Sequence, residues 1–249
     1  MPCLPQILVE GKTFHNYEGE QLGSVPFHTD FAKSCNTAFI SLSSKVGGST
    51  LPDTAKSLGI GACWSLGTPA FAGAVALPTD QVDLAATSFG QGSTLLSPVS
   101  LAVAAATVAR GSYIAPQLVL NGTPSSCAAP ASAAAPLNPT VVSHLHSLMR
   151  EVVTTGTGAV LAKAPGGPVM AKTGTAEYGP GATPKTHAWL VGYQGDIAFA
   201  VYVQDGQSGG TVAAPVALAF LQNLTASQSA SASPKASASH ASPKASASH

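Results

Sequence analysis

A short strand–loop–strand segment at residues 167–193 constrains the fold of this chain more than any other stretch. Its first half carries Lys172-Thr173-Gly174-Thr175 behind small and apolar residues, and a loop rich in glycine and proline separates it from a second apolar run. This pattern is typical of a β-hairpin. Alternation in the first strand places the hydroxyls of Thr173 and Thr175 on one side, and Gly174 leaves the backbone bare. We therefore expect a strand edge with a cation and two hydroxyls, which suits an extended ligand carrying a carboxylate.

Two other interpretations of Lys172 must be weighed. A lysine on a strand edge commonly prevents edge-to-edge pairing of sheets, and a three-residue motif does not exclude that role. Residues 166–173 also nearly match the Gly-x-x-x-x-Gly-Lys-Thr phosphate-binding loop. However, Ala171 stands before the lysine, and a hairpin instead of a helix is predicted to follow. Both departures remove the backbone amides that hold a phosphate.

The rest of the chain mixes helical and extended patterns, which predicts an α/β (α+β) architecture. Apolar residues at helical spacing, capping residues and β-rich runs identify the main elements. We expect strands at 6–9 and 197–203, and helices over 27–46, 50–58, 98–109, 138–154 and 213–221.

The same patterns set the domain boundaries. We expect one domain at residues 1–224, interrupted by an Ala/Ser/Pro-rich stretch at 121–136 that is typical of a flexible surface insertion. Residues 225–249 contain Ser-Pro-Lys-Ala-Ser-Ala-Ser-His twice and almost no large apolar side chain. Such a segment cannot bury enough apolar surface to fold, so we expect a disordered tail.

Composition excludes several classes of function. Lys+Arg and Asp+Glu each total 11, so the formal net charge is zero and no basic surface for nucleic acid is implied. No run reaches the roughly 18 apolar residues of a membrane-spanning helix, and no signal peptide is visible. Cys3, Cys35, Cys63 and Cys127 lack metal-binding spacing, so we expect no metal site and no cofactor. The cysteines permit disulfides without requiring them.

Several motifs in a fixed order favour a binding site at Lys172 over a lysine that only prevents edge-to-edge pairing of sheets. They are Ser34-Cys35-Asn36, Gly90-Gln91-Gly92, the apolar helix opened by Ser97-Pro98, Lys172 to Glu177, and His187 to Tyr193. Together they resemble the transpeptidase domain of penicillin-binding proteins, with the greatest likeness to the class B type of actinobacteria. The resemblance covers roughly residues 1–224. It implies a β-lactamase/transpeptidase-like fold, in which helices flank an antiparallel sheet and a mainly helical subdomain lies beside it.

The resemblance also assigns catalytic roles. Enzymes of this family transfer an acyl group from the D-Ala-D-Ala end of a peptidoglycan stem peptide to a serine. By likeness, Ser34 and Lys172 would be joined by a hydrogen bond and relay a proton to the leaving amine. Asn36 would hold the amide of the substrate. Cys35 occupies the variable position of the motif, and we expect no chemical role for it.

Substrate binding is assigned to the same strand by resemblance. Thr173 and Thr175 would bind the carboxylate, the Thr175 N–H would form half of an oxyanion hole, and Gly174 would leave room for the peptide. β-Lactams imitate the D-Ala-D-Ala end and would bind to the same groups.

The nucleophile of the family is not found in this sequence. It is the serine of a Ser-x-x-Lys motif upstream of Ser-x-Asn, yet no lysine here has a serine three positions earlier. We therefore expect an N-terminally incomplete domain, inactive as given, whose partners are the stem peptide, β-lactams and a missing N-terminal portion. By resemblance it acts on the extracytoplasmic face of the membrane. The alternatives are a non-catalytic module that binds peptidoglycan or β-lactam, and an unrelated scaffold that carries these motifs by chance.

Overall fold

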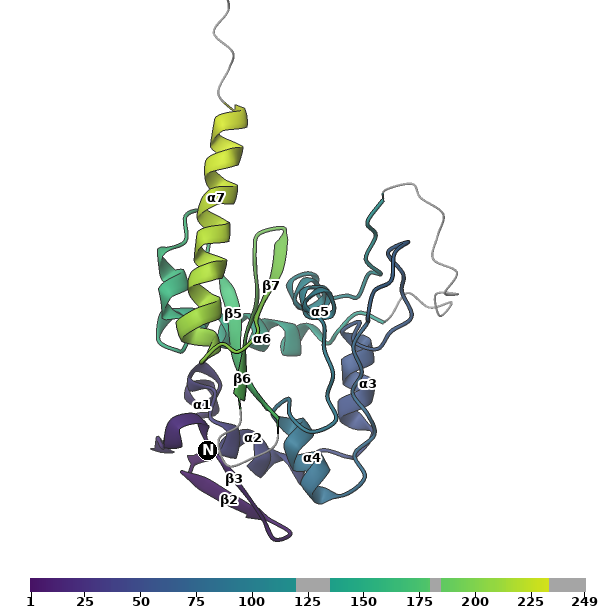
Figure 1. Cartoon of the computed structure of the whole chain (residues 1–249), viewed down its shortest axis with the longest axis vertical. Coiled ribbons are helices and arrows are strands. Elements are labelled where there is room, and N and C mark those ends of the chain that lie inside the picture. Colours follow the sequence, from purple (N-terminus) through teal and green to yellow (C-terminus); the bar gives the residue numbers. More distant parts are fainter. Residues whose placement is uncertain (120–134, 180–184, 233–249) are drawn as a thin grey trace, which may run out of the picture.

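A computed structural model of the chain describes residues 1–119, 135–179 and 185–232. The predicted mixture of helices and antiparallel strands is confirmed (Figure 1). The strands are β1 (Pro2–Cys3), β2 (Gln6–Val9), β3 (Lys12–His15), β4 (Gly23–Ser24), β5 (Met170–Tyr178), β6 (Lys185–Gln194) and β7 (Ile197–Val203). The helices are α1 (Phe27–Lys33), α2 (Asn36–Ser43), α3 (Thr50–Ser57), α4 (Gln81–Ser88), α5 (Pro98–Arg110), α6 (Pro139–Thr154) and α7 (Ala214–Ala232), with short helical turns η1 (Tyr17–Gly19), η2 (Ala159–Lys163) and η3 (Gly209–Ala213).

The central sheet has the order β5-β6-β7, and both pairs are antiparallel. The β5–β6 hairpin predicted from the Lys-Thr-Gly segment is therefore confirmed, as is the third strand at 197–203. In the register of the hairpin, Lys172 lies opposite Val191 and Gly174 opposite Trp189. Because β5 is the first strand of this order, one of its edges is unpaired within the described sheet.

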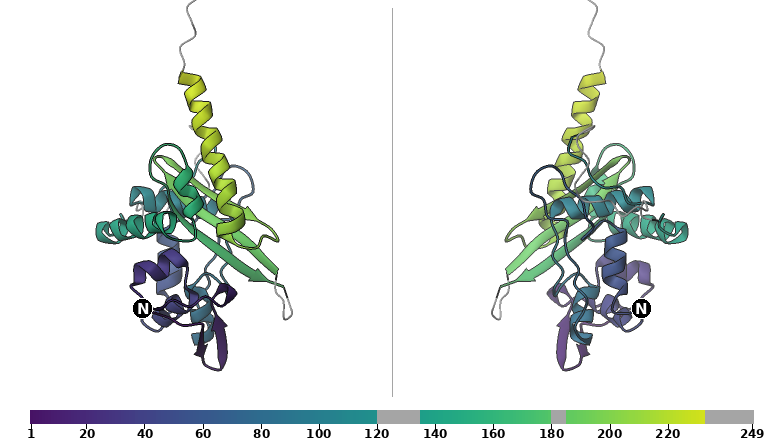
Figure 2. Two further views of the ribbon diagram at one scale, coloured as in Figure 1. Left: turned by 90° about the vertical axis from the view of Figure 1, so that its left-hand side faces the viewer. Right: turned by 90° about the vertical axis from the view of Figure 1, so that its right-hand side faces the viewer.

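Each face of the sheet has its own hydrophobic layer. On one face, Leu190 and Phe199 pack with Ala217 and Leu221 of α7. On the other, Val191 and Tyr193 pack with side chains of α5 and α6, among them Met149. Figure 2 shows the sheet between α7 on one side and α5 and α6 on the other. Side chains alternate along a strand, so the second face, which carries Met170, also carries Lys172.

The N-terminal part forms a separate layer below the sheet in Figure 1. The β2–β3 hairpin packs against α2 and α4, and Phe14, Ile40 and Ala85 form its small core. The predicted helical stretch at 27–46 is divided into α1 and α2 because Ser34 adopts a left-handed conformation, with φ 64° and ψ 39°. That break lies directly beneath β5 and places the Ser-x-Asn motif opposite the Lys-Thr-Gly motif.

Two helices begin where the capping residues predicted. The Ser97 hydroxyl accepts a hydrogen bond from the Ser100 N–H, and Pro98 follows as the first helical residue of α5. The Asn138 side chain accepts hydrogen bonds from the Thr140 and Val141 N–H groups at the start of α6. These helices cover the face of the sheet that carries Lys172. The capping residues therefore set where the helices that pack around the site begin.

Helix α7 continues to Ala232, eight residues beyond the boundary of 224 that we expect for the domain. The reason is that a helix already packed on the sheet extends at little cost through alanine-rich sequence, because nucleation is the expensive step. Residues 233–249, and most of the predicted insertion at 121–136, lie outside the described part of the chain.

No helix in the described ranges is both long and apolar enough to span a bilayer.

Candidate active site

A hydrogen bond between Lys172 and Ser34 joins the sheet to the N-terminal layer. The Lys172 Nζ atom donates to Ser34 Oγ at 2.5 Å and to the Thr173 carbonyl at 2.9 Å. Lys172 projects from β5, and Ser34 sits in the left-handed turn between α1 and α2. A non-glycine residue in that conformation is uncommon and carries strain, which the surrounding contacts must sustain. The two residues predicted to act together are thus in contact.

Burial changes the chemistry of Lys172. Its Nζ lies 5.7 Å from the centre of the Phe31 ring, and burial lowers the pKa of Lys172 to about 8. Desolvation disfavours the charged form of an amine and therefore lowers its pKa. At neutral pH the group remains mainly an ammonium that donates to Ser34. A proton is nevertheless released far more easily here than from an exposed lysine, as a proton relay requires.

Asn36 begins α2, two residues after Ser34. Its Nδ2 atom donates to the His15 carbonyl of β3 at 3.3 Å. Among the polar contacts of the described residues, the Asn36 side chain is therefore held by the β2–β3 hairpin and does not reach Ser34 or Lys172. Its predicted role in holding a substrate amide stays a prediction.

The two threonines of the motif lie in different surroundings. Thr173 is 6% exposed, and its hydroxyl forms a hydrogen bond with the Thr157 hydroxyl at 2.5 Å. The Thr157 N–H in turn donates to the Ala32 carbonyl at 3.1 Å, which ties β5 to the end of α1. Thr175 is only partly buried. Thr175 is therefore the more accessible of the two hydroxyls predicted to bind a carboxylate.

Gly174 lies where another segment crosses the strand closely. A Cβ atom on Gly209 of η3 would come within 2.9 Å of the Gly174 nitrogen and 2.1 Å of the Trp189 carbonyl oxygen. Only a glycine at 209 permits this approach. A Cβ atom on Gly174 itself would meet Trp189 at 3.4 Å, an ordinary contact. Space for a ligand beside Gly174 stays a prediction.

Gln91 makes a contact that the sequence did not predict. It is the middle residue of Gly90-Gln91-Gly92, and its Nε2 atom donates to the Thr175 carbonyl at 3.3 Å. This motif was part of the family resemblance, but the sequence assigned no role to the Gln91 side chain. The bond links the loop after α4 to the unpaired edge of β5.

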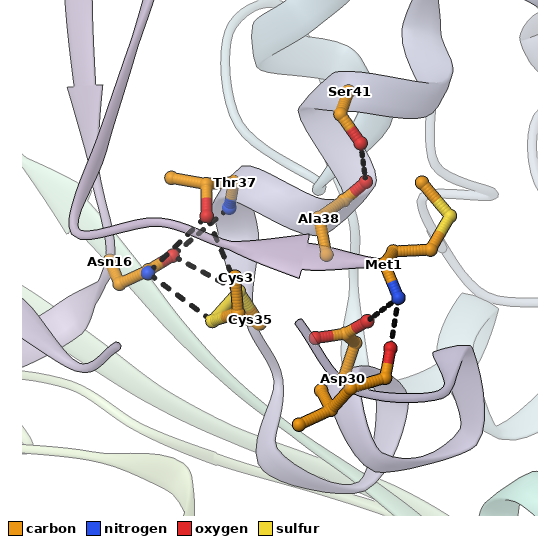
Figure 3. A network of polar contacts seen from close by, with 9 residues as sticks. Met1, Cys3, Asn16, Asp30, Cys35, Thr37, Ala38 and Ser41 are labelled. Atoms are coloured by element: carbon orange, nitrogen blue, oxygen red, sulfur yellow. Dashed lines mark hydrogen bonds and ion pairs between the residues drawn. A yellow bond between two sulfur atoms is a disulfide. The ribbon is translucent and has the colours of Figure 1, made fainter. Parts of the chain in front are cut away.

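The role of Cys35 was also missed. Cys35 forms a disulfide with Cys3, which fixes the turn between Ser34 and Asn36 to strand β1 (Figure 3). Asn16 lies against this disulfide and accepts a hydrogen bond from the Thr37 N–H at 3.0 Å. The four cysteines made disulfides possible, but the sequence did not show which cysteines pair.

A buried carboxylate lies beside the disulfide. Asp30 is fully buried, and the Met1 ammonium lies 3.4 Å from its Oδ2 atom, as Figure 3 shows. The ligand atoms of Cys3, Asp30 and Cys35 all lie within 4.8 Å of one another. Because the two sulfurs are bonded to each other, this cluster offers one carboxylate and no thiolate to a cation.

A family model described as the penicillin binding protein transpeptidase domain matches residues 2–222. The chain belongs to this family. It is 34% identical over 236 residues to the peptidoglycan D,D-transpeptidase PbpA of Mycolicibacterium smegmatis, covering 84% of this chain and 46% of the relative. It is 31% identical over 247 residues to PbpA of Mycobacterium tuberculosis, covering 89% of this chain and 49% of that protein. The chain thus spans about half the length of these relatives.

Solved structures of penicillin-binding proteins have the same fold. The crystal structure of PBPA from Mycobacterium tuberculosis matches with a TM-score of 0.73 and 29% identity, over 89% of this chain and 54% of that one. Penicillin-binding protein 2 of Helicobacter pylori, solved in complex with MreC, matches with a TM-score of 0.76 at 20% identity, over 92% of this chain and 45% of that one. The predicted family and its transpeptidase-like fold are therefore confirmed.

The described contacts combine a desolvated amine bonded to a serine hydroxyl with an unpaired strand edge beside it. Such a pair can move a proton, and such an edge can accept an extended peptide.

Proposed function

We propose that this chain supplies the Ser-x-Asn and Lys-Thr-Gly wall of a peptidoglycan D,D-transpeptidase that acts on D-Ala-D-Ala stem peptides. The observation that carries the proposal is the 2.5 Å hydrogen bond between Lys172 Nζ and Ser34 Oγ. It joins two motifs that lie 138 residues apart in sequence. The bonded lysine has a pKa of about 8, which suits proton transfer near neutral pH.

In the proposed reaction the nucleophile comes from a Ser-x-x-Lys segment outside this sequence, since no lysine here follows a serine by three positions. That serine attacks the penultimate D-Ala carbonyl, an ester forms, and the bond to the terminal D-Ala breaks. Ser34 and Lys172 pass a proton to the departing amine nitrogen, so the terminal D-Ala leaves as a neutral amine or its ammonium. The amine of a second stem peptide then attacks the ester, an amide bond forms, the ester bond breaks and the serine hydroxyl is restored by the proton that the amine loses. Alone, the chain is inactive.

Substrate binding is assigned to β5. The hydroxyl of Thr175, supported by Thr173, receives the terminal carboxylate, and Gly174 leaves space for the peptide. Asn36 turns toward the amide of the substrate when the site is occupied. β-Lactams bind to the same groups because their carboxylate and strained amide imitate the D-Ala-D-Ala end. The reaction belongs to the extracytoplasmic side of the membrane, where peptidoglycan is built.

A second candidate is a non-catalytic module that holds stem peptides or β-lactams reversibly. The absence of a Ser-x-x-Lys motif from the sequence favours it. The two candidates differ in whether a covalent acyl-enzyme forms once a nucleophile is supplied.

Labelling with a fluorescent penicillin distinguishes them. We expect no covalent band on the chain alone, and a band when it is mixed with a polypeptide that carries the Ser-x-x-Lys half of the Mycolicibacterium smegmatis relative. The band should appear on the added polypeptide and fall by about 100-fold or more with Lys172→Met, since proton transfer contributes roughly 10²–10⁴-fold. Lys185→Met is the matched control, because Lys185 is an exposed lysine of β6 that pairs with Asp205.

Three outcomes would count against the proposal. A band on this chain alone would show that it carries a nucleophile. Equal labelling of Lys172→Met and Lys185→Met would remove Lys172 from the reaction. Reversible binding without a band in the mixture would establish the non-catalytic module.

A further inference from the structure

The unpaired edge of β5 is closed by side chains in this structure. In an antiparallel sheet, alternate residues of an edge strand direct both N–H and C=O away from their partner strand. The carbonyls of Thr173 and Thr175 belong to this outward set, because they accept from Lys172 Nζ at 2.9 Å and from Gln91 Nε2 at 3.3 Å. A peptide that adds to this edge needs these same groups.

The two caps differ in origin. Lys172 belongs to β5 itself and bonds the carbonyl of its own neighbour. Gln91 reaches the strand from a different layer, 84 residues away in sequence. Its amide therefore occupies the space along the edge through which an extended ligand would pass.

The backbone around Gln91 is firmly held, so its side chain has a defined starting point. Gly90 and Gly92 have φ values of 85° and 67°, a region that favours glycine. The Gln91 N–H donates to the Ala86 carbonyl at 3.0 Å, which closes the end of α4. A Cβ atom on Gly92 would come within 3.1 Å of Ala86 and Asp83. Only the side-chain torsions of Gln91 are free to open the edge.

We propose that the Gln91 amide is a removable cap on the Thr175 carbonyl, which an extended peptide must displace with its own backbone N–H. The cap makes Gln91 a specificity-determining residue, because it admits ligands that replace the lost hydrogen bond and disfavours those that cannot. This inference rests on the proposed function, since it concerns the same ligand edge.

The test is reversible binding of N-acetylated Lys-D-Ala-D-Ala to the whole chain, measured by calorimetry. Gln91→Ala and Gln91→Met both remove the donor, and methionine keeps the length of the side chain. We expect both variants to bind the peptide about three- to ten-fold more tightly, the range for one neutral hydrogen bond. A peptide N-methylated at its backbone amides cannot replace the lost hydrogen bond, so it should bind the wild type more weakly than the unmethylated peptide does.

A matched variant distinguishes loss of the Gln91 cap from a general weakening of the contacts between the N-terminal layer and the sheet. The Tyr17 hydroxyl donates to the Gln207 carbonyl at 3.3 Å and also bridges the N-terminal layer to the sheet side, but it leaves the Thr175 carbonyl covered. Tyr17→Phe should therefore leave the affinity unchanged. In NMR spectra of the wild-type chain, the Gln91 side-chain amide resonances should shift when peptide is added.

The outcomes separate this inference from the proposed function. If the wild type binds and Lys172→Met does not, while neither Gln91 variant gains affinity, the cap is wrong and the proposed function stands. A gain in peptide affinity with Gln91→Ala but not with Gln91→Met would indicate that the size of the side chain obstructs the edge. The proposal of a hydrogen-bonded cap would then be wrong. An equal gain with Tyr17→Phe would contradict the cap, as would wild-type binding of the N-methylated peptide that is as tight as that of the unmethylated one. No binding by any variant would overturn the cap, whereas the labelling of the mixture would still decide the proposed function.

Discussion

At the scale of single residues, the chemistry of the site depends on one desolvated amine. Lys172 combines a hydrogen bond to Ser34 with the ring of Phe31 nearby. The pairing of Lys172 with Ser34 was predicted from the family resemblance that the ordered motifs indicate. The sequence did not predict the contact of Gln91 or the disulfide of Cys35, because both depend on which loops the fold brings together. No local pattern encodes that information.

The lowered pKa of Lys172 predicts how stability depends on pH. The pKa is about 8 in the folded chain against 10.5 for an unperturbed lysine, so the folded state releases this proton first as pH rises. The unfolded state then binds more protons between about pH 8 and 10.5, and the free energy of unfolding rises with pH. Below pH 8 the buried ammonium lowers stability.

This prediction is checked with urea unfolding of the wild type and Lys172→Met at several pH values from 7 to 10. The free energy of unfolding of the wild type should rise relative to the variant above pH 8, by at most about 1.4 kcal/mol per pH unit. Subtracting the variant cancels the other titrating groups. A difference that is flat or falls with pH would contradict the lowered pKa.

At the scale of elements, local rules explain most of what was predicted. The β5–β6 hairpin, strand β7 and the capped starts of α5 and α6 follow from turn residues, alternation and capping, which are short-range signals. The end of α7 does not follow from them. Its extension to Ala232 depends on a helix that the sheet has already nucleated.

The disulfide predicts how strongly the N-terminal layer depends on one link. Cys3 and Cys35 close a loop with a sequence separation of 32 residues. Replacing both with serine should lower the free energy of unfolding by about 2–4 kcal/mol, because the unfolded chain regains freedom. Urea unfolding should then show a midpoint lower by about 1–2 M. Ser41→Ala in α2 is the control, since the Ser41 hydroxyl donates to the Ala38 carbonyl one turn earlier in the same helix. Equal midpoints for the double variant and the control would rule out this contribution.

At the scale of the whole molecule, the described sheet has two open edges. Side chains of the site cap β5, whereas β7 pairs only with β6 within the described residues. Strand β7 reads Ile-Ala-Phe-Ala-Val-Tyr-Val, which has high β-propensity and no charge. An exposed edge of this kind is a template for pairing with another chain.

The open edge of β7 therefore predicts self-association of the isolated chain. Sedimentation at increasing concentration should show dimers or larger species, and Tyr202→Lys should shift them toward monomer because an edge lysine opposes pairing. Tyr202 is 37% exposed on β7, and its ring lies against His187 and Trp189 of the neighbouring strand β6. Leu8→Lys is the matched control, because Leu8 is an exposed residue of β2, 67% accessible, in the N-terminal layer. Relief by Leu8→Lys alone would place the contact on the β2–β3 hairpin, and a monomeric wild type at every concentration would show that the edge is protected.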